Sequence, residues 1–121
     1  MLYVGIDVAK NKHDIAVVSS DGTIHIRHLT ITNNIEGFIR LGSTLDNLVK
    51  ATGETVQIAL EDTGHYCYNI ISFLREHHFT VFSYNPLIIK EFAKSTSLRK
   101  TKTDRKDAMT IARKLMTDVD K

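Results

Sequence analysis

Cysteine and proline are scarce in this sequence, and long apolar runs are missing. The single cysteine, Cys67, excludes an internal disulfide bond and a Cys-x-x-Cys metal site, and it fits a reducing cytoplasm. No apolar run approaches the ~20 residues that span a bilayer, so we expect no membrane contact. Asp7 lies in the middle of what would be the apolar core of a signal peptide, so none is predicted. These absences favour a cytoplasmic protein.

What is present is the composition of an ordinary folded domain. The chain has 121 residues, of which 42% are hydrophobic and 25% charged. This length is enough to bury one hydrophobic core and falls within the size range of one domain. No repeat or change in composition marks a second domain, so we expect residues 1–121 to fold as a unit.

The first third of the chain predicts three antiparallel strands. Residues 2–8 and 15–18 are short apolar runs rich in β-forming residues, and the polar residues 10–14 separate them. The Asp21-Gly22 pair then predicts a tight turn. Residues 24–31 alternate apolar and polar side chains, which is typical of an outer strand with one face in water.

The next segment predicts a helix that crosses over the sheet. Asn33 is the expected N-cap, with Glu36 as its partner in a capping box, and Gly53 is the expected stop signal. Between them, apolar residues recur at spacings of three and four. Residues 56–61 follow as a strand that ends in an acid.

The rest of the chain continues the alternation of helix and strand. Tyr68 and the apolar residues up to position 74 predict one side of a second helix, and residues 79–84 predict a fifth strand. Pro86 fits the first turn of a third helix. Residues 95–98 break that pattern, and a last helix is predicted from about Asp104 through Met116. Alternating strands and helices imply parallel pairing. We therefore predict an α/β fold with a mixed five-stranded sheet, its first three strands antiparallel and helices on both faces.

Four acids are candidates for one site. Asp7 lies in the first strand and Glu61 at the end of the fourth, which this topology makes its neighbour about 4.8 Å away. Asp104 and Asp107, three residues apart, would lie roughly 5 to 6 Å apart on one helix face. Each also has a structural interpretation: Asp7 as an acceptor from loop amides and Asp104 as a helix cap. Asp62 is an alternative to Glu61.

Four carboxylates without His or Cys form a hard oxygen ligand set, which Mg²⁺ or Mn²⁺ prefers. No predicted helix carries a His-x-x-x-His pair, which argues against a zinc enzyme. Two divalent ions about 3.5 to 4 Å apart support phosphodiester chemistry. The four acids therefore predict a magnesium or manganese centre.

Basic residues are concentrated between positions 90 and 106, a stretch that contains seven Lys or Arg and only two acids. Such a patch binds a phosphate backbone without reading sequence, although a solvated charged face is the alternative. Tyr66 and Tyr68 are candidates for stacking on bases, or for packing on the second helix. The candidate nucleic-acid-binding residues are Lys94, Arg99, Lys100, Lys102, Arg105 and Lys106.

Three blocks of this sequence resemble the DEDD transposases, the insertion-sequence family that includes pilin-gene-inverting recombinases. The third block is the most specific, and the likeness covers nearly the whole chain. In chain order, the blocks are Gly5-Ile6-Asp7-Val8-Ala9-Lys10, Glu61-Asp62-Thr63-Gly64-His65-Tyr66, and Thr101-Lys102-Thr103-Asp104-Arg105-Lys106-Asp107-Ala108.

The resemblance implies a RuvC-like, RNase H-type fold and a metal-dependent DNA transposase or recombinase. It favours Glu61 over Asp62 and implies a catalytic tetrad of Asp7, Glu61, Asp104 and Asp107. It also implies that residues 1–121 are an N-terminal domain whose C-terminal partner, with a nucleophilic serine, is absent from this chain. The expected partners are DNA, that missing domain, further copies of the full-length protein and, in some relatives, a structured guide RNA.

Three other functions remain open at this stage. A Holliday-junction resolvase-like nuclease would share the fold and the ions. An actin-like or sugar-kinase half-domain would share the Gly5-Ile6-Asp7 strand, but it needs a Gly-rich loop that this sequence lacks. A non-catalytic nucleic-acid-binding module would use the acids only as caps and surface charges. Ser95 and Ser97 are expected to be loop residues rather than nucleophiles.

Overall fold

The computed structural model describes residues 1–61, 64–96 and 108–119, and it contains one five-stranded sheet in the order β3-β2-β1-β4-β5. β1 pairs antiparallel with β2, which pairs antiparallel with β3, whereas β4 lies parallel to both β1 and β5. This arrangement confirms the predicted mixed sheet and its antiparallel first three strands. The strands are β1 (Leu2–Asp7), β2 (Lys12–Ser19), β3 (Ile24–Thr32), β4 (Val56–Glu61) and β5 (Thr80–Tyr84).

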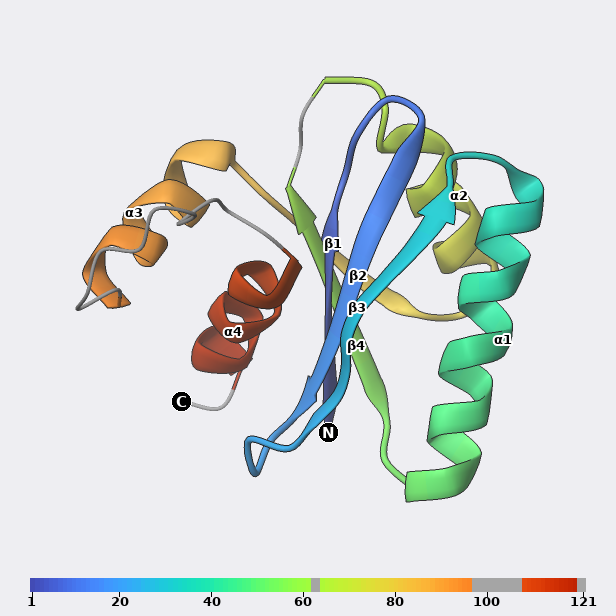
Figure 1. The fold of residues 1–121 in the computed structure, drawn as a ribbon, viewed down its shortest axis with the longest axis horizontal. Helices are drawn as coiled ribbons and strands as arrows, with labels where there is room; N and C mark the ends of the chain where they lie inside the picture. The colour runs from blue at the N-terminus through green and yellow to red at the C-terminus, as the bar shows by residue number, and fades with distance from the viewer. Residues whose placement is uncertain (62–63, 97–107, 120–121) are drawn as a thin grey trace.

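Helices cover both faces of the sheet, as predicted (Figure 1). Helices α1 (Ile35–Thr52) and α2 (Tyr68–Glu76) bury one face, and α3 (Pro86–Thr96) and α4 (Ala108–Val119) lie on the other. Side chains alternate across β1, so that Val4 joins the core under α1 and α2 while Tyr3 packs with Ile111 of α4. None of the helices in the described part of the chain is long and apolar enough to cross a membrane.

The N-cap of helix α1 lies one residue later than predicted. Asn34, not Asn33, accepts the backbone N–H of Gly37 at 2.9 Å, so Glu36 lies in the first turn without being the return partner of a capping box. The Asn33 carboxamide instead donates to the Lys10 carbonyl at 2.9 Å. At the other end, the expected stop at Gly53 is confirmed by its positive φ of 74°.

Three further local expectations were wrong. The polar residues 12–14 belong to β2, because pairing with strands on both sides outweighs their polarity. Tyr68 is 63% exposed, so it does not belong to the apolar side of α2. The buried residues on that side are Ile70 and Leu74. Ser95 lies inside α3, where its hydroxyl donates to the Phe92 carbonyl at 3.0 Å. The predicted helix start near Asp104 lies outside the described residues.

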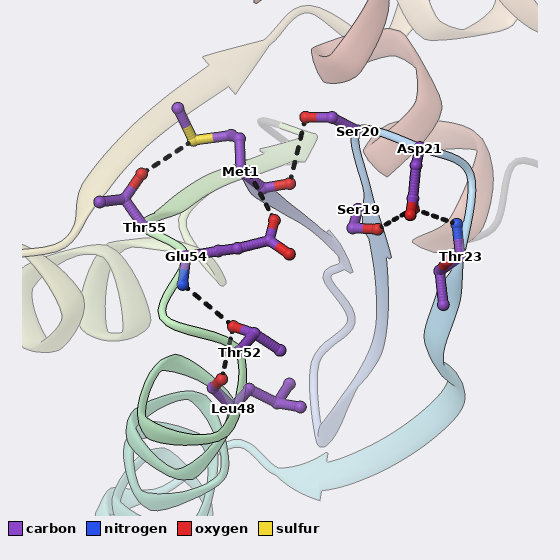
Figure 2. A network of polar contacts seen from close by, with 9 residues as sticks. All are labelled: Met1, Ser19, Ser20, Asp21, Thr23, Leu48, Thr52, Glu54 and Thr55. Atoms are coloured by element: carbon purple, nitrogen blue, oxygen red, sulfur yellow. Dashed lines mark hydrogen bonds and ion pairs between the residues drawn. The ribbon is translucent and has the colours of Figure 1, made fainter.

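Polar contacts fasten the end of the sheet where β1 begins (Figure 2). Asp21 in the β2–β3 turn accepts from the Ser19 hydroxyl at 2.5 Å and from the Thr23 amide at 3.0 Å, and these bonds lower its pKa to about 2. The N-terminal ammonium of Met1 pairs with Glu54 at 2.5 Å. These contacts tie β1, the β2–β3 turn and the end of α1 together, away from Asp7 at the other end of β1.

Helix α4 rests directly on the backbone of β1 at Gly5. A Cβ atom added to Gly5 would lie 2.0 Å from the Ala108 carbonyl oxygen and 2.5 Å from the Ala112 nitrogen. Ile111, Ala112 and Leu115 are buried on this face of the sheet. Only glycine permits this approach, which brings the first turn of α4 to the end of β1.

We predict that Gly5→Ala lowers the free energy of unfolding by about 1–3 kcal/mol, the usual effect of overpacking a core, because backbone atoms of α4 have to move. Gly42→Ala is the matched control, since its added Cβ would meet only the Phe73 ring at 3.6 Å. Alanine inside a helix should then stabilise by up to about 1 kcal/mol. Denaturant titration of both variants checks this, and equal stabilities would contradict the close packing at Gly5.

Candidate active site

Asp7 and Glu61 end two neighbouring parallel strands. In the β1–β4 pair Ile6 is level with Leu60, so the two acids are the next residues on each strand. By strand alternation both share the face of Tyr3 and Ala59, which is the face that α4 covers. Glu61 is only 4% exposed, whereas Asp7 is partly exposed. Two acids therefore lie at the carboxyl ends of adjoining parallel strands, on one face of the sheet.

The remaining predicted site residues lie mostly outside the described part of the chain. These are Asp104 and Asp107 of the tetrad, the alternative Asp62, and the basic residues Arg99, Lys100, Lys102, Arg105 and Lys106. Helix α4 is described from Ala108, the residue that follows Asp107 in the sequence. Lys94 is exposed near the end of α3. Within residues 1–61, 64–96 and 108–119, no group of three His, Cys, Asp or Glu is placed to hold a metal ion.

Asp14 is a third acid at this end of the sheet, and it is not among the predicted site residues. It lies directly opposite Asp7 in the β1–β2 pair. Its Oδ1 accepts from the Thr30 hydroxyl at 2.8 Å and pairs with His28 Nε2 at 3.3 Å. The signal was available, because two strands joined by a short turn pair residues at equal distances from that turn. Because residues 10–14 were interpreted as a connection between strands, Asp14 was left out of the predicted site.

A pocket of ≈ 720 Å³ opens between the first turns of α4 and the strands β1 to β3. It brings together groups from the three consecutive strands and from α4, which is far from them in the sequence. Acids and cations are both present, so the pocket is suited to a ligand that carries phosphate groups near a metal ion. Its lining residues are Asp7, Asp14, Arg27, His28, Ala108, Met109, Thr110 and Arg113.

His13 and Asn33 hold the segment that follows Asp7. The backbone N–H of Ala9 donates to His13 Nδ1 at 3.2 Å, and Asn33 bonds the carbonyls of Lys10 and Asn11, each at 2.9 Å. His13 is fully buried, and this burial lowers its pKa below the ordinary value of 6.5, although the Asn33 side chain and the Asp14 charge act in the opposite direction. His13 therefore works as a neutral acceptor that fixes the end of β1.

The pKa of His13 predicts a loss of stability on acidification. Because its pKa is lower in the folded protein, the unfolded chain takes up a proton first as the pH falls below about 6.5, and the free energy of unfolding decreases. Above that pH this contribution does not change. We expect His13→Gln to flatten the dependence between pH 7.5 and about 5. Denaturant titrations of both proteins check this, and parallel curves would contradict it.

The two tyrosines after Gly64 are accessible. Tyr66 is 37% exposed and Tyr68 is 63% exposed, and the Tyr66 ring lies 5.0 Å from that of His65. The predicted packing of Tyr68 inside the domain is therefore wrong. Stacking on a base stays a prediction for both.

Comparison with known proteins matches nearly the whole chain to one family. Residues 4–121 match the family model of DEDD transposases of the IS110 type, which is described as "Transposase". The pilin gene-inverting proteins of Moraxella lacunata and Moraxella bovis are 37% and 36% identical over 111 residues, 92% of this chain and 33% of each relative. The mini-circle putative transposase for IS117 of Streptomyces coelicolor is 29% identical over 118 residues, 98% of this chain and 28% of that protein. The chain thus spans about a third of the length of the curated relatives it matches.

Two solved structures of a RuvC protein share the fold. T. thermophilus RuvC in complex with a Holliday junction substrate has a TM-score of 0.56 at 13% identity, covering 93% of this chain and 90% of that one. A second Thermus thermophilus RuvC structure has a TM-score of 0.52 at 16% identity, with coverage of 93% and 91%. Together with the five-stranded sheet, these likenesses confirm the predicted RuvC-like, RNase H-like fold.

Proposed function

The chain belongs to the DEDD transposase family of the IS110 type, and from this premise we propose that it is the metal-binding catalytic domain of a DNA transposase or site-specific recombinase. The single observation that carries the proposal is the position of Asp7 and Glu61 at the ends of two adjoining parallel strands, on the face covered by α4. In open α/β sheets, ligands bind beyond the carboxyl ends of parallel strands. This is the edge where the two acids lie.

The acids that the structure describes fit a divalent metal by their chemistry. Carboxylate oxygens are the ligands that Mg²⁺ and Mn²⁺ prefer, and a carboxylate as buried as Glu61 costs less to keep ionised beside a cation. Asp7 and Glu61 would hold the ion, and we propose that Asp104 and Asp107 complete its ligand set. When bound, such ions activate the attacking oxygen and stabilise the leaving oxygen of a phosphodiester.

The other residues would position DNA at these acids. Asp7 lines an open pocket, whereas Glu61 is buried and is not among the lining residues, so a phosphate group would approach from the side of Asp7. The segment after Asp7 is anchored by His13, which fixes the end of β1. Lys94, Arg99, Lys100, Lys102, Arg105 and Lys106 would bind the phosphate backbone without reading sequence.

Recombination needs more protein than this domain. The matched region is about a third of the relatives' length, and we propose that residues 1–121 act with a C-terminal domain that supplies a nucleophilic serine. Further copies of the protein and a structured RNA are proposed partners on the strength of the family resemblance. Such an enzyme would act on DNA in the cytoplasm. The relatives are named as a transposase and as gene-inverting proteins, which favours this function over a resolvase-like nuclease. Cleavage of branched DNA by the domain alone would instead support the nuclease.

We predict that Asp7→Asn weakens Mn²⁺ binding by about tenfold or more, since losing even an outer-shell partner of a metal ligand costs 10- to 100-fold. The variant should unfold at the same denaturant concentration as the unaltered domain or a higher one, because it removes repulsion between clustered acids. Isothermal titration calorimetry with Mn²⁺ measures the affinity. Asp46→Asn is the matched control, because Asp46 is exposed on α1 at the opposite face of the sheet.

Two results would contradict the metal centre. A folded wild-type domain that binds no Mn²⁺ at millimolar concentration would show that the acids serve another purpose, as in a non-catalytic binding module. A marked loss of stability in Asp7→Asn with unchanged Mn²⁺ affinity would make Asp7 a structural residue.

A further inference from the structure

The four arginines in the described part of the chain fall into two pairs. Arg40 donates to the Thr30 carbonyl at 3.3 Å, and Arg75 donates to the Val81 carbonyl at 2.9 Å, so both are engaged in holding the fold. Arg27 and Arg113 are exposed, and their guanidinium groups make no hydrogen bond or ion pair with the residues that the structure describes. Nothing in that part of the fold explains why these two positions carry a guanidinium group.

Arg27 and Arg113 nevertheless line the same pocket. Arg27 lies on β3 and Arg113 on α4, so two elements that are far apart in sequence bring their side chains to one cavity. Asp7 lines that cavity as well. The pocket therefore joins two uncommitted cations to the acid that we propose as a metal ligand.

Two acids, Asp7 and Asp14, share the pocket with this pair of cations. Oδ1 of Asp14 accepts from the Thr30 hydroxyl and pairs with His28, and Asp14 makes no ion pair with either arginine in the described part of the chain. Asp7 is left as the other acid in the lining, and a bound divalent cation would offset its charge. The pocket would then be electropositive, which favours an anionic ligand.

We propose that Arg27 and Arg113 bind phosphate groups of the DNA strand that passes Asp7, with each guanidinium holding one phosphate. This inference rests on the proposed function, from which it takes DNA as the ligand. The planar guanidinium fork matches a phosphate group, and such contacts fix the register of a nucleic acid without reading its sequence. Lys94 lies on α3, which Figure 1 places beyond α4 from the sheet. DNA would thus be held on both sides of α4.

The salt dependence of DNA binding tests this assignment. Fluorescence anisotropy with a labelled DNA duplex over a series of KCl concentrations, at one fixed MnCl₂ concentration, gives the slope of log K against log salt. Each phosphate contact contributes about 0.9 to that slope, so R27Q/R113Q should reduce it by about 1.8 and each single variant by about 0.9. R27K/R113K keeps both charges and should retain the wild-type slope. Because both side chains are exposed, all these variants should fold, which denaturant titration confirms.

Arg40→Gln is the matched control, because it removes the same charge from α1 on the opposite face and should leave the slope unchanged. An unchanged slope for R27Q/R113Q, or an equal loss for Arg40→Gln, would overturn the assignment while leaving Mn²⁺ binding, and so the proposed metal centre, intact. If R27Q/R113Q reduced the slope only for an RNA duplex of the same sequence, and not for DNA, DNA would be overturned as the ligand. A wild-type domain that binds no DNA would overturn both this inference and the proposed action on DNA.

Discussion

The contact between α4 and the backbone of β1 is the constraint on which the candidate site depends. Because Gly5 has no side chain, the Ala108 carbonyl and the Ala112 amide of α4 approach the strand more closely than any other residue would permit. Apolar side chains of α4 then bury themselves around Tyr3 and Ala59. A helix that is distant in sequence is thereby held with its first turn at the end of the strand that carries Asp7.

The sheet topology supplies the other half of the site. The crossover through α1 returns the chain as β4, parallel to β1, and this brings Glu61 to the same edge as Asp7. The antiparallel hairpin on the other side brings Asp14 opposite Asp7 and, through β3, adds Arg27 to the pocket. The parallel and antiparallel neighbours of one central strand therefore contribute different chemistry. The parallel neighbour β4 adds a buried acid, and the antiparallel hairpin adds an acid and a cation to the open pocket.

Local sequence patterns were sufficient to predict the elements and the order of the fold, but not the details that depend on long-range pairing. Period-two and helical spacings identified the strands and α1, and two acids stood out: Asp7 within the first strand and Glu61 at the end of the fourth. The cap at Asn34 rather than Asn33 is a shift of one residue, decided by the hydrogen bond that Asn33 makes to Lys10. Asp14, Arg27 and Arg113 were missed because strand register and helix packing bring them together, and neither is visible in local sequence. The resemblance to a family, rather than spacing, favoured Glu61 over Asp62.

The central claim is that the strand acids and the acids preceding α4 form one metal centre, and a double-mutant cycle on Mn²⁺ affinity tests it most directly. Glu61→Gln, Asp107→Asn and the double variant would each be titrated with Mn²⁺ by calorimetry, with denaturant titration to confirm folding. Residues that share one ion are strongly coupled, so the second substitution should cost far less affinity than it does alone. Two losses that simply add, or an Asp107→Asn variant with wild-type affinity, would contradict a shared centre.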